Sequence, residues 1–334
     1  MQKHIVNNAG EKDYQAKVEE IAQKLKTWSG PIVLIAHIDP DGDALGSTLS
    51  LKRALQAMGK STTLAMDVPK YLEFITHSGE IVKEIENFEE NTLLVVMDVD
   101  ISNRAVGAPL EGADFVINVD HHGSNARLGD ISLVQPSKAA AAIMSKDIID
   151  ALGVSWNSDM ATAALTGIIT DTGNFRYSNT NSEVLEVAAE LLAKGVDYAT
   201  LTDRLQWRHP DYFKMLALVL ATLEFPFDGL VAMANLTPKM EESLSGDDDS
   251  NDYVGLIRYA EGTKVAVFIK EREDHCKISV RTRDGVSAQN ICLALGGGGH
   301  IAAAGAKIDA NLEETKKLVL EQIRLELIRN NLLT

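Results

Sequence analysis

The chain has 334 residues, and its 48 acidic and 32 basic side chains give it a formal net charge of −16. Hydrophobic residues make up 45% of it and charged residues 24%, a balance that is typical of folded globular proteins and excludes extensive disorder. The acidity argues against long nucleic acids as partners, because duplex-binding proteins neutralise phosphates with Lys and Arg. The length is sufficient for two domains.

The cysteine count and the hydropathy bear on the cellular compartment of the protein and on its association with membranes. Only Cys276 and Cys292 are present, which excludes a disulfide framework and favours a reducing cytoplasm. No apolar run approaches the roughly 18 residues that a membrane span needs. The polar start MQKHIVNNAG is not typical of a signal peptide. We therefore expect a cytoplasmic protein without a membrane partner.

The first half of the chain alternates between strand and helix patterns. Short apolar, β-rich runs predict strands at 31–36, 62–66, 92–100 and 114–120. Apolar residues at helical spacing predict helices at 14–28, 44–58, 81–88, 138–152, 161–170 and 182–195. Because strands alternate with helices and two strands are almost wholly apolar, we expect an α/β fold with a mainly parallel sheet covered by helices on both faces.

The pattern changes after residue 195. Segment 196–225 is mostly helical and is interrupted by His209-Pro210, which predicts a helical linker. Beyond it, the sequence predicts strands at 229–236, 264–270 and 276–282, an acidic loop at 246–252 and a final helix at 312–332. The predicted organisation is therefore a larger domain at 1–195, the linker 196–225, and a smaller α/β domain at 226–334.

Polar residues that can bind metal stand where a parallel sheet places its ligand-binding loops. They follow four apolar runs and are His37, Asp41, Asp43, Asp98, Asp120, His121, His122 and Asp171. A single Asp in such a place is usually a turn former or a helix N-cap. Together, however, so many acids need compensating cations, and clusters rich in carboxylates suit Mn²⁺ or Mg²⁺ better than structural zinc. Two such ions sharing a carboxylate form the arrangement used for phosphoester hydrolysis.

Five motifs carry a resemblance to a known family. They are HIDPDGDALGS (37–47), MDVDISNR (97–104), VDHHGSN (119–125), GIITDTGNFR (167–176) and, after SVRTR (279–283), GGGGHIAAAG (296–305). The first four resemble, in order and spacing, the motifs of DHH-superfamily phosphoesterases, and the last is similar to the signature of the DHH-associated domain. The resemblance implies a DHH catalytic domain with a dinuclear metal site at 1–195, a substrate-binding domain at 226–334, and an active-site cleft between them.

The resemblance also implies roles for the polar residues. One ion would be bound by His37, Asp41 and Asp98. The second would be bound by Asp43, Asp98, His121 and Asp171. Mn²⁺ is the expected ion at both sites, with Mg²⁺ or Co²⁺ as alternatives. Asp98 would bridge the ions, and His122 would face the scissile phosphate or the leaving group, although the division of roles between the two histidines stays open. Asp120 is interpreted as orienting the imidazoles by hydrogen bonds, with a strand-end cap as the alternative.

The predicted substrate-binding residues lie mainly in the smaller domain. Gly297, Gly298 and Gly299 allow backbone amides to approach an anionic group, and His300 adds a donor or a positive charge. Arg281 and Arg283 alternate on a strand, so both would face the same side and could bind a phosphate, the alternative being a solvated face. Arg104 and Asn125 match positions near the active cleft of the family.

The resemblance implies a function for the whole chain. The similar enzymes hydrolyse short oligoribonucleotides (2–5 nt) to mononucleotides and dephosphorylate adenosine 3′,5′-bisphosphate (pAp) to AMP. Hydrolysis of cyclic or linear di-adenosine phosphates is an alternative, and a non-catalytic nucleotide-binding protein is an alternative of another class. The acidic balance opposes long duplexes as partners but not substrates with a few phosphates. Whether the chain forms a homodimer stays open.

Overall fold

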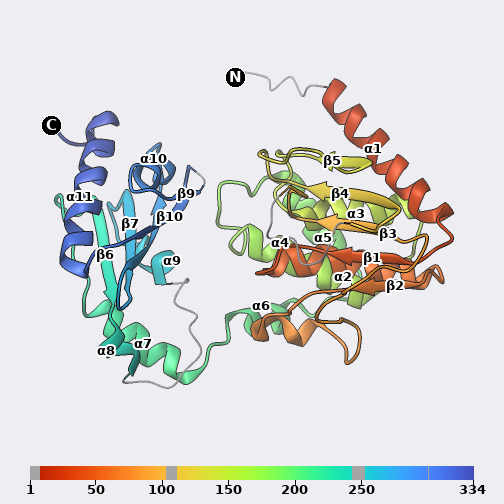
Figure 1. Ribbon diagram of the computed structural model, residues 1–334, viewed down its shortest axis with the longest axis horizontal. Helices are drawn as coiled ribbons and strands as arrows, with labels where there is room; N and C mark the ends of the chain where they lie inside the picture. Colours follow the sequence, from red (N-terminus) through yellow and green to blue (C-terminus); the bar gives the residue numbers. More distant parts are fainter. Residues whose placement is uncertain (1–7, 103–110, 243–252, 300) are drawn as a thin grey trace. The chain divides into compact units, whose positions relative to one another are not determined.

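The computed structural model describes residues 8–102, 111–242, 253–299 and 301–334 (Figure 1). The chain divides into two compact units, Met1–Trp207 and Arg208–Thr334. Helix α6 (Tyr198–Gln206) belongs to the first unit, and α7 (Pro210–Leu220) lies in the second. Pro210 at the first turn of α7 explains the break, because proline cannot continue a preceding helix but suits a helix start.

The first unit is built on a sheet of five parallel strands, in the order β2-β1-β3-β4-β5. The strands are β1 (Ile32–Ile35), β2 (Thr62–Leu64), β3 (Leu93–Met97), β4 (Phe115–Asp120) and β5 (Ile131–Val134). Every residue of β1 and β3 is buried, as their continuous apolar runs predict. The four-residue β5 was not predicted, because its short run ISLV lacks a clear pattern.

Besides α6, which adds Leu201 and Leu205, five helices contribute to the main core with one face of this sheet. They are α1 (Asn8–Thr27), α2 (Gly42–Ala57), α3 (Ala141–Leu152), α4 (Ser158–Asp171) and α5 (Ser182–Leu192). Asn157 and Asn181 cap α4 and α5 by accepting hydrogen bonds from backbone amides. All five helices were predicted, with ends that differ by a few residues.

The other face of the sheet carries a smaller apolar cluster that includes Val33, Ile35 and Val96. Ile85 and Phe88 pack against it from a segment without helical structure, so the helix predicted at 81–88 is wrong. Val82 instead forms a parallel bridge with Ala65 at the end of β2. Pairing with the sheet edge and burial of the two apolar side chains outweigh the weak helical periodicity of this segment. A 3₁₀ helix, η1 (Lys70–Ile75), precedes it.

The second unit contains a mixed sheet in the order β6-β7-β8-β10-β9. Its strands are β6 (Val231–Leu236), β7 (Val265–Glu271), β8 (Cys276–Thr282), β9 (Gly298–Gly299) and β10 (Ala303–Ile308). Among the described strands of this sheet, only β6 and β7 pair in parallel. Helices α10 (Ala288–Leu293) and α11 (Leu312–Arg329) share a core with one face of this sheet. On the other face, α7 and α9 (Tyr253–Ile257) pack over β6 and β7.

The predicted fold class is confirmed: a parallel sheet with helices packed against it is joined to a smaller α/β unit. Among the described residues, the helices of the first unit share a core with one face of that sheet, and non-helical segments cover the other face, so the expected cover by helices on both faces is not seen there. Strands β6, β7 and β8 and the last helix of the second unit were predicted, whereas β9, β10, α8 (Pro238–Glu242), α9 and α10 were not. The predicted acidic loop at 246–252 lies outside the described residues. No helix in the described part of the chain combines the length and the apolar character that crossing a membrane requires.

Candidate metal centre

The candidate centre lies at the carboxyl-terminal edge of the first sheet. His37 follows β1 by two residues, Asp98 follows β3 directly, and His121 follows β4. Asp171 comes from a different kind of element, since it is the last residue of helix α4. Parallel strands end at the same edge of a sheet, and this geometry brings residues far apart in the sequence into one group.

Helix α2 supplies two carboxylates from its first turn. Asp41 is the N-cap, and its Oδ1 accepts hydrogen bonds from the amides of Asp43 and Ala44 at 2.9 and 3.0 Å. Asp43 is fully buried, and its two oxygens accept from the amides of Ala141 and Ala142 at 2.6 and 2.8 Å. These amides begin α3, so Asp43 joins two helices. Burial raises the pKa of Asp43 well above its usual value, and the negative charge of Asp98 is the second cause of this rise.

Asp98 occupies the middle of the cluster. Its Oδ1 lies 3.3 Å from His121 Nε2, and its Oδ2 lies 3.7 Å from His37 Nε2. Oδ1 is buried and accepts no well-aligned hydrogen bond from the described residues. The backbone of Asp98 has φ of 60°, a left-handed conformation that non-glycine residues rarely adopt. Burial alone would raise the pKa of Asp98, but contacts with His121 and His37 outweigh it and lower this pKa.

His121 directs one ring nitrogen into the carboxylates. Its Nε2 lies 3.6 Å from Asp171 Oδ2 and 3.9 Å from Asp43 Oδ2, and its Nδ1 lies 3.2 Å from the carbonyl oxygen of Lys138. Burial alone would lower the pKa of His121, but Asp98, Asp43 and Asp171 raise it to about 10. Burial raises the pKa of Asp171 to about 7, with His121 opposing this shift. The group therefore holds excess negative charge that a cation would neutralise.

His122 has a different environment. Its Nδ1 lies 2.7 Å from Asp120 Oδ1, and this hydrogen bond is the main cause that raises the pKa of His122. Asp120 is fully buried, and its Oδ2 accepts a hydrogen bond from Asn125 Nδ2 at 2.6 Å. The same amide group donates to Asn118 Oδ1 at 2.8 Å. A chain of hydrogen bonds thus runs from Asn118 and Asn125 through Asp120 to the His122 ring.

The geometry forms two separate groups of metal-ligand type, which a third group connects. One contains His37, Asp41 and Asp98, and the other contains Asp43, His121 and Asp171, each with ligand atoms within 4.8 Å of one another. A third group joins Asp98 to His121 and His122. Asp98 presents one oxygen toward His37 and the other toward His121. The orphaned Asp98 Oδ1 and the set of oxygen and nitrogen donors fit divalent cations.

The residues predicted to bind substrate lie mainly in the second unit, which is a different compact body. Arg281 is on β8, and its Nη1 donates to the carbonyl oxygen of Val280 at 3.1 Å. The guanidinium of Arg283, just beyond β8, donates to the carbonyl oxygen of Arg258. Arg104 and His300 lie outside the described residues.

The glycine run has a structural role in the second sheet. Gly298 and Gly299 form β9, which pairs with Ala304 and Gly305 of β10. A Cβ atom at Gly297 would lie 2.1 Å from the carbonyl oxygen of Gly305, so the backbones approach too closely for any other residue. Gly298, in contrast, has no neighbouring atom within 4 Å of such a Cβ. A side chain at Gly298 would therefore meet open space, in contrast to one at Gly297.

Comparison with known proteins decides the family. Residues 31–168 match the N-terminal domain of the DHH family, and residues 242–325 match the DHHA1 domain. A protein from Thermus thermophilus named bifunctional oligoribonuclease and PAP phosphatase NrnA is 50% identical over 96% of this chain and 98% of its own length. The chain belongs to the DHH family. The resemblance of its motifs to DHH and DHH-associated domains is confirmed.

Other proteins that are similar to this chain differ in name and extent. The cyclic-di-AMP phosphodiesterase PdeA of Listeria monocytogenes is 26% identical over 92% of this chain, which covers 49% of that protein. A crystal structure of an exopolyphosphatase-related protein from Bacteroides fragilis has a TM-score of 0.82, 20% identity and 97% coverage of each chain. At that identity, the structural likeness establishes the fold alone.

Three residues of the DHH unit serve the site but were not predicted. Asn118 is buried and donates to the carbonyl oxygens of Val96 and Val99 at 3.1 and 2.9 Å, which ties β4 to the loop that carries Asp98. Lys138 contributes its backbone carbonyl to His121. Gly167 lies against Asp43. A buried Asn inside an apolar strand was the one available signal, since FVINVD contains it.

Proposed function

We propose that this protein is a metal-dependent phosphoesterase that hydrolyses oligoribonucleotides of 2–5 nt to mononucleotides and dephosphorylates pAp to AMP. The observation that carries the proposal is the set of three carboxylate–histidine groups at one edge of the sheet, two of which contain Asp98. The 50% identity to the Thermus thermophilus NrnA protein over nearly the whole chain supports the substrate class. The match covers nearly all of both chains, so the two share their domain architecture. We therefore favour oligonucleotides and pAp as the substrates of this chain.

The expected cofactors are two divalent ions, and we favour Mn²⁺ over Mg²⁺ or Co²⁺. His37, Asp41 and Asp98 would hold one ion, and Asp43, His121 and Asp171 with Asp98 would hold the other. The mixture of carboxylates with imidazole favours Mn²⁺ over Mg²⁺, which prefers oxygen ligands alone. When bound, such ions lower the pKa of a water molecule and neutralise charge on phosphoryl oxygens.

The two histidines have separate roles in this proposal. An ionised carboxylate only accepts hydrogen bonds, so Asp120 holds a proton on Nδ1 of His122. The Nε2 atom of His122 is then the one that can meet substrate, where it stabilises charge on the phosphate or donates a proton to the leaving oxygen. His121 donates from Nδ1 to the Lys138 carbonyl and keeps Nε2 toward Asp98, as a metal ligand requires.

The DHHA1 domain is proposed to bind substrate. Arg281 is half-buried on the sheet face opposite α11, and a guanidinium suits bidentate binding of a phosphate. Arg283, the glycines at 297–299 and His300 complete the proposed set, with Arg104 and Asn125 in the DHH domain. In this structure Asn125 binds Asp120, so its part in substrate binding would be indirect.

Hydrolysis of cyclic or linear di-adenosine phosphates is a second candidate, because PdeA matches 92% of this chain. A non-catalytic nucleotide-binding protein is the candidate of another class. All six proposed metal ligands are present, which favours an enzyme. The two free cysteines are consistent with the expected cytoplasmic location. A homodimer remains a prediction.

A turnover comparison tests the proposal. Purified protein with Mn²⁺ is given labelled ribonucleotides of two to five residues, pAp, and cyclic di-AMP, with EDTA as the matched control. We expect release of mononucleotides and of phosphate from pAp, and no reaction in EDTA. Cleavage of cyclic di-AMP with pAp and the oligonucleotides left intact would favour the second candidate. Binding without any turnover would favour the non-catalytic one.

A further inference from the structure

Three lysines stand in one row across the sheet of the second unit. Lys270 of β7 pairs in register with Lys277 of β8, and Lys277 pairs with Lys307 of β10. Directly paired residues of antiparallel strands point to the same face. With strands about 4.8 Å apart, the row extends over roughly 10 Å between its outer strands. Like charges placed opposite each other are unfavourable, so the row needs an explanation.

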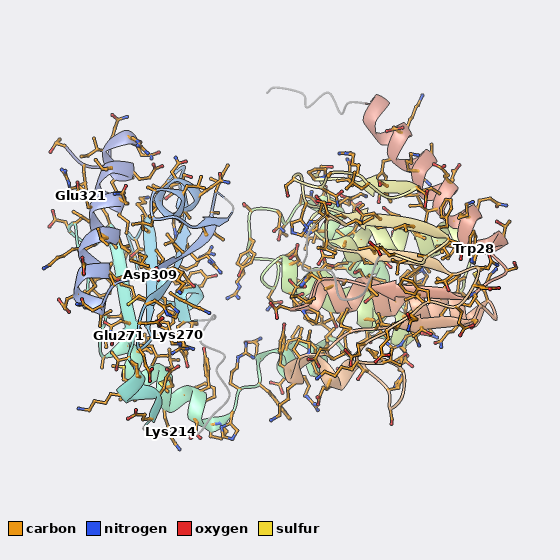
Figure 2. All side chains as sticks on the ribbon, viewed as in Figure 1. Trp28, Lys214, Lys270, Glu271, Asp309 and Glu321 are labelled. Carbon is orange, nitrogen blue, oxygen red and sulfur yellow. The ribbon has the colours of Figure 1, made fainter. Side chains whose placement is uncertain are left out.

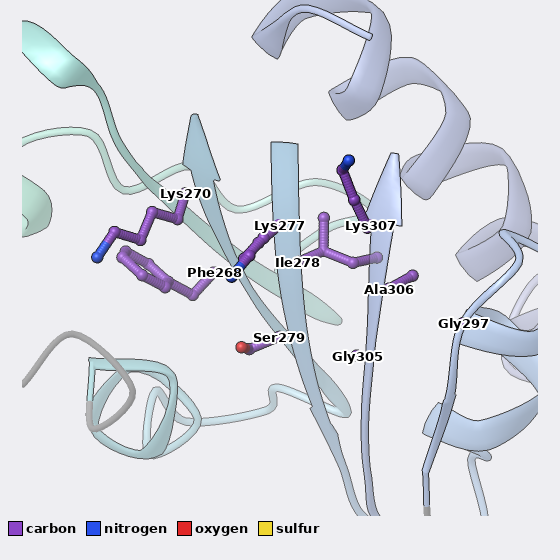
Figure 3. Close-up of a pocket in the computed structure, with 9 residues that line it drawn as sticks. All are labelled: Phe268, Lys270, Lys277, Ile278, Ser279, Gly297, Gly305, Ala306 and Lys307. Atoms are coloured by element: carbon purple, nitrogen blue, oxygen red, sulfur yellow. The ribbon is translucent and has the colours of Figure 1, made fainter. Parts of the chain in front are cut away.

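The row lies on the face of the sheet opposite α11. Ile278, the neighbour of Lys277, is buried in the core that α11 shares, and side chains alternate along a strand. Helices α7 and α9 cover this second face over β6 and β7. Over β8 and β10 it forms a pocket of about 420 Å³ (Figure 3). Its lining includes Phe268, Lys270, Lys277, Ser279, Gly305 and Lys307.

The charges of the row are only partly neutralised. Lys270 lies on β7 (Figure 2). It is buried, and its Nζ is 3.2 Å from Glu241 Oε1. Lys307 is exposed, and its Nζ is 3.5 Å from the exposed Asp309. Among the described residues, no carboxylate lies within ion-pair distance of Lys277. In a chain of net charge −16, a row of lysines with an incomplete set of acidic partners is a local attraction for anions.

The sheet face that carries the row also carries Arg281, a proposed substrate-binding residue. Lys277, Ser279 and Arg281 alternate along β8 and so share the face that carries the pocket. The four-residue step from Lys277 to Arg281 corresponds to roughly 13 Å along a strand. The hydroxyl of Ser279, between them, can donate to a phosphate oxygen. Basic and polar side chains at regular spacing on one strand suit an extended chain of phosphates.

We propose that Lys277 and Lys307, with Ser279, bind backbone phosphates of an oligoribonucleotide whose terminal part is held near Arg281. This inference rests on the proposed function and adds a length-dependent binding site to it. A ligand as short as pAp, held near Arg281, does not extend to the row. Oligonucleotides of several residues do reach it. The row therefore raises affinity for the longer substrates and leaves pAp unaffected.

Direct binding of labelled oligonucleotides tests the proposal. Fluorescence anisotropy in EDTA, where no turnover is expected, is measured for two- and five-residue oligoribonucleotides over a range of KCl concentrations. The K277Q and K307Q variants are compared with K317Q, which removes an exposed charge from α11 on the other side of the sheet. Inorganic triphosphate at matched ionic strength serves as a free competitor.

The expected result is a loss of affinity for the five-residue ligand of roughly two- to fivefold per lysine, the scale of an exposed ion pair. The slope of log Kd against log salt should fall by about 0.7 per lysine. Binding of the two-residue ligand and turnover of pAp with Mn²⁺ should match K317Q.

Three outcomes would overturn the row as an oligonucleotide site. The first is equal affinity of K277Q and K317Q for the five-residue ligand. The second is an equal loss of affinity for ligands of every length. The third is a site that depends on Lys277 and is occupied by inorganic triphosphate alone. Failure of the wild-type protein to hydrolyse pAp or oligonucleotides would instead refute the proposed function. The binding comparison in EDTA is independent of that result, so the two failures are distinguishable.

Discussion

Gly167 of α4 lies directly against the carboxylate of Asp43 on α2. A Cβ atom at position 167 would stand 2.7 Å from Asp43 Oδ1 and 2.7 Å from the Cβ of Ala142. The absence of a side chain therefore lets three helices meet where Asp43 also accepts the amides of α3. The position of this proposed metal ligand depends on a residue that cannot itself bind metal.

Substitution of Gly167 by alanine should consequently disturb the centre. Alanine favours a helix more than glycine does, yet the clash should cost roughly 1–3 kcal/mol of unfolding free energy, as overpacking does. We expect Mn²⁺ affinity, measured by calorimetric titration, to fall at least about tenfold with the displaced Asp43 carboxylate. Unfolding in EDTA gives the structural part separately. Unchanged metal affinity in a folded G167A protein would show that the contact does not position Asp43.

The Asp120–His122 pair gives a second prediction. Asp120→Asn replaces an obligate acceptor with an amide that can also donate, so the His122 ring loses its fixed proton on Nδ1. We expect kcat for pAp to fall by roughly 10–100-fold, while Mn²⁺ affinity changes little. Asn125→Ala, which removes the other contact of Asp120, should have a smaller effect of the same kind. If D120N lost metal instead, Asp120 would belong to the ligand set.

The strand-end residues of the centre were predictable because their positions follow from one rule. Asp98 and His121 come directly after apolar runs, and the ends of parallel strands meet at one edge. The predicted residues His37, Asp41, Asp43 and Asp171 reach the same edge from a loop or helix ends. Their joint presence in ordered motifs made the prediction possible, since each alone is also a common capping residue.

Other parts could not be predicted because the partners are not visible in a sequence. Asp43 is held by backbone amides of Ala141 and Ala142, and alanine side chains carry no signal for this role. The segment at 81–88 has helical spacing, but Phe88 packs against the apolar cluster on one face of the sheet. Likewise, Gly298 pairs with Gly305 of β10, and β10 is recognisable as a strand only through its pairing with β8.

A buried ion pair away from the centre predicts a pH dependence of stability. Arg53 donates to both oxygens of Glu80 at 2.7 and 2.8 Å. Burial alone would raise the pKa of Glu80, but Arg53 outweighs it and lowers this pKa below its ordinary value of 4.5. A lowered pKa in the folded state contributes stability above pH 4.5, and the contribution is lost as pH falls through and below that value.

Glu80→Gln should therefore destabilise the protein by about 1–3 kcal/mol at pH 7. The difference from wild type should shrink as pH falls below about 4.5, where the wild-type carboxylate takes up a proton as the chain unfolds. Urea unfolding at several pH values measures this difference in the free energy of unfolding. Glu186→Gln, an exposed change of equal charge on α5, is the control. A difference that stays constant from pH 7 to well below pH 4.5 would contradict the role of the Glu80 charge.

Asp98→Asn tests the shared carboxylate. Asparagine has the same shape and tolerates the left-handed backbone at this position, so the fold should persist. A neutral amide cannot serve two cations as a carboxylate does, and turnover should fall by more than the roughly 10–100-fold that loss of an outer hydrogen-bond partner costs. Steady-state kinetics with pAp at saturating Mn²⁺ measures the loss. Activity close to wild type in D98N would refute the two-ion assignment.

Metal binding should also appear as a gain in thermal stability. Asp43 is buried and Asp171 is half-buried beside Asp98, and the same desolvation and mutual repulsion that raise their pKa values oppose the ionised, metal-free state. Mn²⁺ at 100 times its Kd should stabilise the first unit by about 2.7 kcal/mol per site, which corresponds to a rise in Tm of roughly 5–10 °C. Differential scanning calorimetry in Mn²⁺ and in EDTA measures this shift. D98N should lose most of the rise, whereas K317Q should retain it. An equal rise in D98N and wild type would mean that the stabilising ions bind elsewhere.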